Sequence, residues 1–138
     1  MPSVLPDSSH PRLMIADDDP VVRSMLNISL SQAFDVVGIA ADGEQAVEFA
    51  KASQPDVALV DVEMPRGGGL RAVQGIHEVA PNTAIVLLSI DESDGIVREL
   101  MQAGATTYLR KGVGPHALAD ALMASIEAHA VECGRPAG

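Results

Sequence analysis

The sequence is poor in aromatic and in basic residues. Its 138 residues include no tryptophan, one tyrosine and two phenylalanines, although 47% of them are hydrophobic, so its core must be aliphatic. Nine lysines and arginines stand against 19 aspartates and glutamates, giving a net charge of −10. This charge argues against binding of nucleic acids or anionic membranes by the chain itself, whereas a cluster of acids that captures a cation is compatible with it.

Cysteine and long apolar runs are also scarce. Cys133 is the only cysteine, so the chain holds no internal disulfide, and we expect a cytoplasmic protein. No stretch approaches the roughly 18 apolar residues of a membrane span. Residues 1–11 lack the basic and apolar regions of a signal peptide, and we expect them to form a disordered lead-in. The folded domain is predicted to cover residues 12–130, with a flexible tail over 131–138.

Short apolar runs alternate with amphipathic segments along the chain. Asp19 is a candidate helix N-cap before Pro20, a second helix begins at Asp42-Gly43, and Gly104 is a candidate C-terminal cap. Near-continuous apolar strands separated by helices predict a parallel sheet covered on both faces, a doubly wound α/β fold of flavodoxin-like strand order 2-1-3-4-5. The predicted strands are residues 12–17, 35–40, 56–60, 84–88 and 106–110, and the later helices are 70–79, 93–103 and 115–129.

Polar residues follow the predicted strands at the points where the strands end. Asp17 and Asp18 follow the first strand, Asp61 the third, Ser89 the fourth and Lys111 the fifth. Ligands of open parallel sheets bind outside the carboxyl ends of the strands, so we expect these side chains to meet at one edge.

The chemistry of this set points to a divalent cation and a phosphoryl group. Packed carboxylates repel one another, and Mg²⁺, which prefers oxygen ligands, removes the penalty. Asp18, Asp61 and a backbone carbonyl near Glu63 could bind the ion, and Asp17 could hold a metal-bound water. With the ammonium of Lys111 and a hydroxyl, these are the groups that phosphoryl transfer to an aspartate requires.

Five segments in order resemble the receiver domain of bacterial two-component response regulators. The resemblance spans roughly residues 12 to 130. The segments are MIADDDPVVR (14–23), ADGEQA (41–46), PDVALVDVEMP (55–65), VLLS (86–89) and GATTYLRK (104–111).

The resemblance implies roles for the acidic residues. Asp61 would accept a phosphoryl group from a phosphohistidine on a sensor histidine kinase or a phosphotransfer protein. Asp17 and Asp18 would hold Mg²⁺ together with Asp61 and the main-chain oxygen of Glu63. The domain would be a signalling switch, and it would not turn over a small metabolite.

The same resemblance implies a switch built on three further residues. Lys111 would contact the phosphoryl group, Ser89 would move to hydrogen-bond it, and Tyr108 would swing inward. The face made by the predicted fourth helix, fifth strand and fifth helix would report the change, and a homodimer could form through it.

The chain departs from the common family pattern in three places. Ile90 stands where a small residue is usual and could restrict access to the phosphoryl group. Lys111 is followed by Gly112 instead of proline, and the segment KGVGP (111–115) resembles regulators with a LuxR-type helix-turn-helix output. The glycines of RGGG (66–69) are interpreted as a flexible loop, since they fit no phosphate-binding motif.

Two other functions stay open at this stage. One is a degenerate receiver that binds a partner without being phosphorylated. The other is a Mg²⁺-dependent phosphatase, because Asp17-Asp18-Asp19 contains the Asp-x-Asp spacing of enzymes with an aspartate nucleophile. The four scattered histidines show no metal-ligand spacing and are interpreted as surface residues: His10, His77, His116 and His129.

Overall fold

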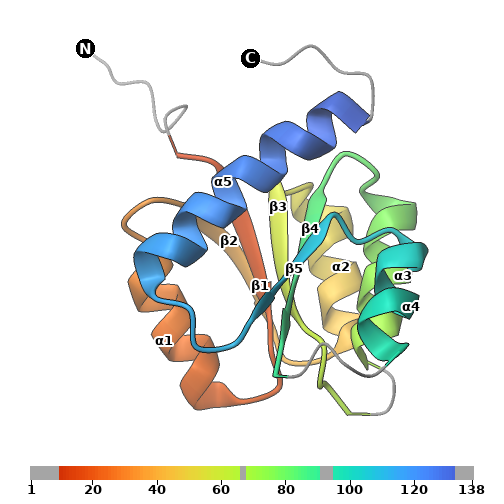
Figure 1. Cartoon of the computed structure of the whole chain (residues 1–138), viewed down its shortest axis with the longest axis horizontal. Coiled ribbons are helices and arrows are strands. Elements are labelled where there is room, and N and C mark those ends of the chain that lie inside the picture. Colours follow the sequence, from red (N-terminus) through yellow and green to blue (C-terminus); the bar gives the residue numbers. More distant parts are fainter. Residues whose placement is uncertain (1–9, 66–67, 91–94, 133–138) are drawn as a thin grey trace.

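The computed structural model describes residues 10–65, 68–90 and 95–132 and has the predicted alternation of strands and helices (Figure 1). The strands form one parallel sheet of order β2-β1-β3-β4-β5, so the doubly wound, flavodoxin-like prediction is confirmed. The strands are β1 (Arg12–Ala16), β2 (Asp35–Ala40), β3 (Val57–Asp61), β4 (Ala84–Ser89) and β5 (Thr107–Arg110). The helices are α1 (Pro20–Leu30), α2 (Gly43–Ser53), α3 (Gly68–Val79), α4 (Gly95–Ala103) and α5 (Pro115–Glu132).

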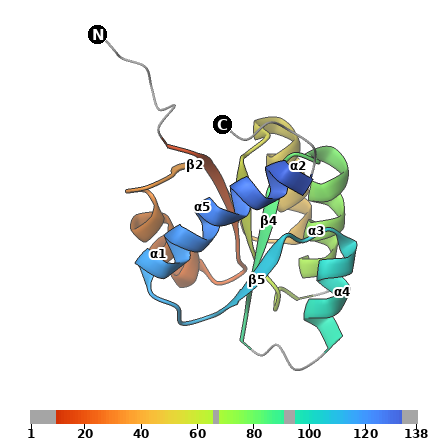
Figure 2. The ribbon, with the colours of Figure 1, turned by 45° about the horizontal axis from the view of Figure 1, so that its top comes forward.

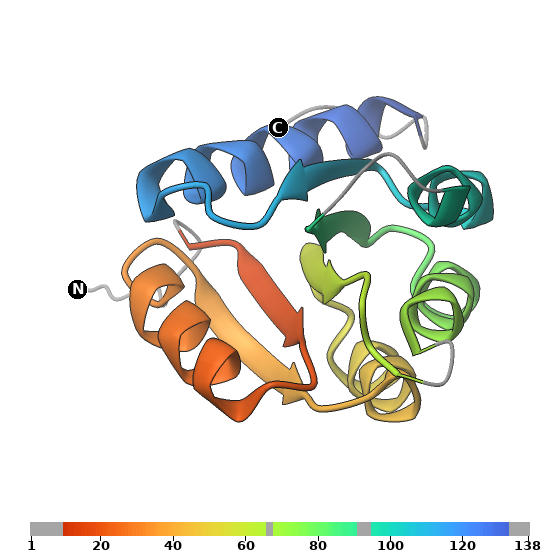
Figure 3. The ribbon, with the colours of Figure 1, turned by 60° about the horizontal axis from the view of Figure 1, so that its bottom comes forward.

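Helices cover both faces of the sheet. Figure 3 shows α1 and α5 on one face and α2, α3 and α4 on the other. Successive side chains of a strand point to opposite faces, and each central strand therefore feeds two aliphatic clusters. In β1, Leu13 and Ile15 pack on the side of α1 and α5, whereas Met14 and Ala16 pack on the side of the other three helices. This two-sided burial explains why the central strands read as continuous apolar runs.

The predicted ends of two helices agree with the structure. Asp19 is the N-cap of α1, where its side chain accepts a hydrogen bond of 2.9 Å from the Val21 N–H. Gly104 follows α4 with a φ of 130°, a left-handed conformation that favours glycine. The five strands begin and end within one residue of their predicted limits.

The start of α3 differs from its prediction. Gly68 and Gly69 were interpreted as loop, but they are buried in the first turn of the helix. A Cβ atom on Gly69 would lie 2.9 Å from the carbonyl oxygen of Val62, and one on Gly68 would lie 3.0 Å from the Cβ of Met64. The glycines therefore let α3 begin directly against the backbone that leaves β3. Residues 66–67 of the same predicted loop lie outside the described residues.

The interpretation of His129 as a surface residue is wrong, although the other three histidines are exposed. His129 is 5% exposed, and its Nε2 lies 2.8 Å from the carbonyl oxygen of Pro81. Its Nδ1 lies 3.4 Å from Thr106 Oγ1, which itself accepts a hydrogen bond from the Ile85 N–H. Because a carbonyl oxygen only accepts, Nε2 is the donor of the contact with Pro81. These contacts fasten the end of α5 to the start of β4, over which the helix passes in Figures 1 and 2.

The predicted domain limits can be compared with the structure only near residues 10 and 132. The predicted lead-in falls mainly on residues 1–9 and the predicted tail on residues 133–138, which lie outside the described residues. The α5 helix continues through Val131 and Glu132, the first two residues of the predicted tail. Among the helices that the structure describes, none combines the length and the hydropathy needed to cross a bilayer.

We predict that His129→Ala lowers the free energy of unfolding by about 1–3 kcal/mol, because it removes a buried side chain together with its contacts to the Pro81 carbonyl and the Thr106 hydroxyl. Urea denaturation of the two proteins measures the difference. His116→Ala, a matched change at an exposed position of the same helix, should stay within about 0.5 kcal/mol of wild type. Equal effects of the two substitutions would contradict the anchoring role.

Candidate functional site

The carboxyl ends of four strands bring the predicted polar residues to one edge of the sheet, which faces the viewer in Figure 3. Asp17 and Asp18 directly follow β1, and Asp61 is the last residue of β3. Ser89 ends β4, and Lys111 follows β5. All of these strands are parallel, so their ends meet although the residues are far apart in sequence.

Backbone pairing fixes the register of the three residues at the carboxyl ends of β3, β4 and β5. Asp61 pairs with Leu88 in the ladder between β3 and β4, which places it beside Ser89. The N–H of Lys111 donates a 2.9 Å hydrogen bond to the Ser89 carbonyl, so the ladder between β4 and β5 extends to the lysine. The sheet itself therefore positions the acid, the hydroxyl and the ammonium.

Three carboxylates form a cluster at this edge. One oxygen from each of Asp17, Asp18 and Asp61 lies within 4.8 Å of the others. Asp17 is 1% exposed and Asp61 is 3% exposed, whereas Asp18 is open to solvent. Like charges this close resist ionisation together, and a cation would relieve the repulsion.

The environment of Asp17 is unfavourable for its negative charge. Burial raises the pKa of Asp17, and the neighbouring Asp61 and Asp18 carboxylates raise it further. A hydrogen bond from the Asp19 N–H, 2.9 Å from Asp17 Oδ1, and the charge of Lys111 act in the opposite direction. The net shift is upward, so the folded chain disfavours the charged form of Asp17.

The second carboxylate oxygen of Asp17 indicates what kind of ligand this cluster would bind. Asp17 Oδ2 is buried, and no hydrogen-bond donor among the described residues reaches it. An unpartnered buried carboxylate oxygen costs free energy, and a metal ion or its bound water would satisfy it. The ligand atoms that the cluster offers are oxygens, which Mg²⁺ prefers.

Lys111 supplies the positive charge of the site. Its Nζ lies 2.9 Å from Asp61 Oδ1 and 3.3 Å from Glu63 Oε1. Partial burial by itself lowers the pKa of Lys111, but hydrogen bonding and attraction to Asp61 and Glu63 outweigh it and raise the pKa. The lysine therefore remains an ammonium ion that is shared between two carboxylates.

Glu63 takes part through its side chain, which was not predicted. Only the main-chain oxygen of Glu63 was expected at the site. Its carboxylate contacts Lys111 and also lies 3.3 Å from the Ile90 N–H and 3.5 Å from Ser89 Oγ. The N–H of Glu63 donates a 3.0 Å hydrogen bond to Asp61 Oδ1, which fixes its backbone beside the acid. No sequence pattern signals this, because the contacts join residues on three separate segments.

Tyr108 and Ile90 occupy the border of the site. Tyr108 lies on β5, half-buried against the aliphatic cluster on the side of α2, α3 and α4. Ile90, the bulky residue that could restrict access to the phosphoryl group, is 60% exposed, so most of its side chain is in contact with solvent. Asp19 is occupied as the N-cap of α1 and does not join the acidic cluster.

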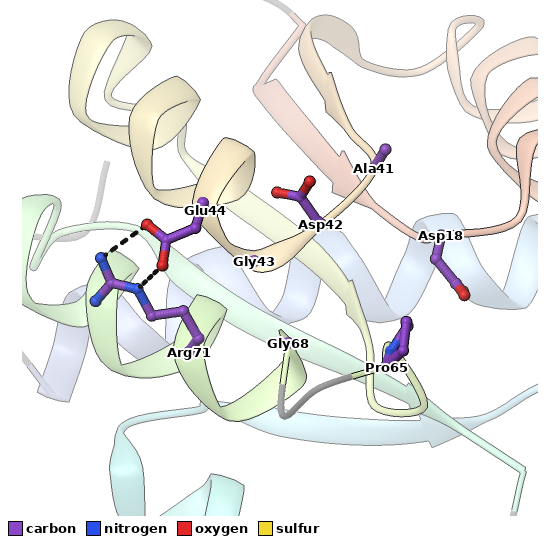
Figure 4. Close-up of a pocket in the computed structure, with 8 residues that line it drawn as sticks. All are labelled: Asp18, Ala41, Asp42, Gly43, Glu44, Pro65, Gly68 and Arg71. Carbon is purple, nitrogen blue, oxygen red and sulfur yellow. Dashed lines mark hydrogen bonds and ion pairs between the residues drawn. The ribbon is translucent and has the colours of Figure 1, made fainter.

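A cleft of about 370 Å³ opens beside the acids (Figure 4). Asp18 and Pro65 lie on one side of the cleft, and the salt bridge between Glu44 and Arg71 lies on the other. In this salt bridge Arg71 Nε is 2.8 Å from Glu44 Oε2. Asp18 thus lies between the buried carboxylates and the solvent-filled cleft. A cation could approach the cluster from this side.

Comparison with known proteins gives a consistent result. The sequence model of the Response regulator receiver domain family matches residues 13–123. The chain is 38% identical to the transcriptional regulatory protein YxjL of Bacillus subtilis over 87% of its own length and 56% of that protein. It is 34% identical to the response regulator GacA of Pseudomonas aeruginosa over 80% of its length and 53% of that protein. The chain therefore spans about half the length of these relatives.

A solved structure shares both fold and sequence with the chain. The signal receiver domain of the response regulator NarL of Mycobacterium tuberculosis superposes with a TM-score of 0.77 at 31% identity. The match covers 86% of this chain and 97% of that domain. The likeness thus extends over essentially a whole receiver domain.

We predict that Asp17→Asn raises the free energy of unfolding of the metal-free protein by about 1 kcal/mol, because it removes a disfavoured buried charge. The amide oxygen can still accept from the Asp19 N–H. The same variant should lose most of the rise in melting temperature that millimolar Mg²⁺ gives the wild type.

Thermal unfolding with Mg²⁺ or with a chelator measures both effects. Asp19→Asn is the control, since it removes the same charge from an exposed residue and asparagine also caps helices well. A destabilised Asp17→Asn protein that keeps the full response to Mg²⁺ would exclude the metal role.

Proposed function

This chain belongs to the response regulator receiver domain family, and we propose that Asp61 is its phosphoacceptor. As a receiver domain it is a phosphoacceptor of two-component signalling and not a turnover enzyme, and a histidine kinase is the partner that this implies. The assignment of roles to Asp61 and to the residues around it is our own.

The observation that carries the proposal is the position of Asp61. It ends the central strand β3 almost completely buried, 2.9 Å from an ammonium and among two further carboxylates. A structural ion pair would not require Asp17 and Asp18 beside it, because their charges oppose that of Asp61. A site for transferring a dianionic group benefits from this arrangement once a cation is bound.

The reaction is a transfer from nitrogen to oxygen. A carboxylate oxygen of Asp61 attacks the phosphorus of a phosphohistidine on the kinase or on a phosphotransfer protein. The new P–O bond forms as the P–N bond breaks, and the electron pair of the broken bond stays on the imidazole nitrogen, which takes up a proton. Lys111 and the Ser89 hydroxyl stabilise the charge on the transferred oxygens.

The acidic cluster is the proposed binding site for Mg²⁺. The side chains of Asp17, Asp18 and Asp61 and the main-chain oxygen of Glu63 would hold the ion. When bound, Mg²⁺ neutralises negative charge on the carboxylates and on the phosphoryl oxygens. The unpartnered oxygen of Asp17 supports the inclusion of this buried residue in the set.

The proposed response to phosphorylation passes from Ser89 to β5. Ser89 would close on the phosphoryl group, and Tyr108, three residues before Lys111, would move inward from its half-buried position. The surface of α4, β5 and α5 would change with it and would serve output or homodimer formation. A two-state equilibrium of this kind needs only contacts that differ between the states.

The output of the switch is proposed from the relatives. YxjL is described as a transcriptional regulatory protein, and the chain matches about half of it. We propose that the domain regulates transcription through another part of a longer cytoplasmic protein, in keeping with its segment KGVGP. The net charge of −10 makes direct DNA binding by this chain unfavourable.

Neither alternative function has an observation in its favour. The phosphatase reading requires Asp17 and Asp19 to act as a pair, but Asp19 caps α1. The degenerate-receiver reading rested on Ile90, whose side chain is mainly exposed. The acids and the lysine that phosphorylation requires lie together.

Incubation with acetyl phosphate and Mg²⁺ should increase the intact mass of the protein by one phosphoryl group. The gain should vanish in Asp61→Asn and on addition of a chelator, because it needs both the nucleophile and the cation. Asp56→Asn, at an exposed aspartate of the preceding turn, should retain it. A gain that survives in Asp61→Asn would place the acceptor elsewhere.

Tyr108 gives an internal reporter of switching, since the chain has one tyrosine and no tryptophan. Phosphorylation should change its fluorescence at constant Mg²⁺ concentration. Ser89→Ala should still gain mass but lose most of the fluorescence change, because the hydroxyl links the phosphoryl group to the switch. An equal change in Ser89→Ala and wild type would remove Ser89 from the mechanism.

A further inference from the structure

The Glu63 carboxylate contacts a specific set of donors. One of its oxygens faces the Lys111 ammonium at 3.3 Å, and the other lies 3.3 Å from the Ile90 N–H and 3.5 Å from the Ser89 hydroxyl. Two anionic oxygens therefore hold an ammonium, a backbone amide and a hydroxyl that come from the ends of β4 and β5. The three donors converge beside the Asp61 carboxylate, which shares the ammonium at 2.9 Å.

Two of these donors are the ones that the proposed function gives to the phosphoryl group. The Ser89 hydroxyl has one hydrogen, so it cannot donate to the Glu63 carboxylate and to a phosphoryl group at the same time. The Lys111 ammonium already uses two of its three N–H groups on Asp61 and Glu63, so a phosphoryl group with several anionic oxygens competes with Glu63 for it. The Ile90 N–H, adjacent to Ser89, is a third donor pointing at the same anion. The Glu63 carboxylate thus stands where phosphoryl oxygens would find their partners.

We infer that Glu63 is an internal competitor of the phosphoryl group: its carboxylate occupies the phosphoryl-binding donors of the resting domain and must leave when Asp61 is phosphorylated. The inference rests on the proposed function of Asp61. Glu63 is then a positioning residue. Its contacts favour the resting state over the phosphorylated state and slow the transfer of a phosphoryl group to Asp61.

The geometry allows this displacement. The contacts of the Glu63 carboxylate are longer than the 2.7–2.9 Å typical of strong charge-assisted hydrogen bonds, so each is weak. The Glu63 side chain is 38% exposed, and water can solvate it when it swings out. Its backbone is held separately, through the hydrogen bond from its N–H to Asp61 Oδ1 at 3.0 Å. The side chain can therefore leave while the main chain stays in place.

A supporting role for Glu63 would give the opposite result. If Glu63 served to hold Lys111 in a productive position, its removal would slow phosphorylation. A simple repulsion between Glu63 and the anionic phosphodonor would depend on the charge of residue 63 but not on its contacts. The choice of substitutions must separate these three cases.

The experiment compares Glu63→Ala, Glu63→Asp and wild type with acetyl phosphate and Mg²⁺, following the phosphorylated fraction by intact mass. We expect Glu63→Ala to be phosphorylated about fivefold to tenfold faster, since the donors no longer have to be released. Glu63→Asp keeps the charge but shortens the side chain by one methylene, and it should show most of the gain. Glu48→Ala, at an exposed glutamate of α2, should react at the wild-type rate.

A second measurement detects the contact without phosphorylation. In ¹H–¹⁵N spectra at constant Mg²⁺ concentration, the Ile90 amide should shift in Glu63→Ala and in Glu63→Asp but not in Glu48→Ala. Beryllofluoride, which mimics a phosphoryl group on aspartate, should bind Glu63→Ala about fivefold to tenfold more tightly than wild type. A stability change alone would produce neither effect.

The outcomes separate the inference from the function on which it rests. Wild-type or slower phosphorylation of Glu63→Ala, with mass gained on Asp61, would overturn the competitor role and leave Asp61 as the acceptor. A wild-type rate in Glu63→Asp beside a fast Glu63→Ala would assign the effect to charge and also overturn it. Absence of Asp61-dependent phosphorylation and of beryllofluoride binding in every protein would overturn the proposed function, and the competitor role with it.

Discussion

Repulsion among carboxylates held at one edge of the sheet is the constraint on which the rest of the site depends. The backbones of Asp17, Asp18 and Asp61 are held close together, because Asp17 and Asp18 follow β1, Asp61 ends β3, and these two strands pair with each other. The shifted pKa of Asp17 and its unpartnered oxygen are the local cost of this arrangement. The cost is tolerable because two aliphatic clusters stabilise the sheet from both faces. A cation bound at this cluster would relieve the repulsion.

Lys111 offsets part of the repulsion and connects the acids with the donors of the neighbouring strands. It is shared between Asp61 and Glu63, and Glu63 also reaches the end of β4. Viewed with the proposed function, the resting domain already contains an anion at its phosphoryl-binding donors. Phosphorylation would then exchange one anion for another, with the balance set by contacts that are individually weak. Small differences in such contacts are sufficient to shift a two-state equilibrium.

Prediction from sequence succeeded where structure follows local pattern and failed where it follows long-range packing. The strands of the sheet were found from short apolar runs, and Asp19 was recognised as a helix cap from its place before Pro20. Gly68 and Gly69 read locally as loop, yet the close approach of α3 to the end of β3 makes them helical and buried. His129 looked like an isolated polar residue because its partner Pro81 lies 48 positions earlier in the chain.

The sequence by itself determined the order of the elements, the doubly wound fold and the set of acids, hydroxyl and lysine at the strand ends. These follow from hydrophobic periodicity and from the rule that parallel strands end at a common edge, which are properties of short segments. Only the tertiary structure decided that the Glu63 carboxylate reaches Lys111 and Ile90, and that one oxygen of Asp17 is buried without a partner. Side-chain contacts within a few ångströms depend on how separate strands register and how helices pack against them, and no local pattern encodes those distances.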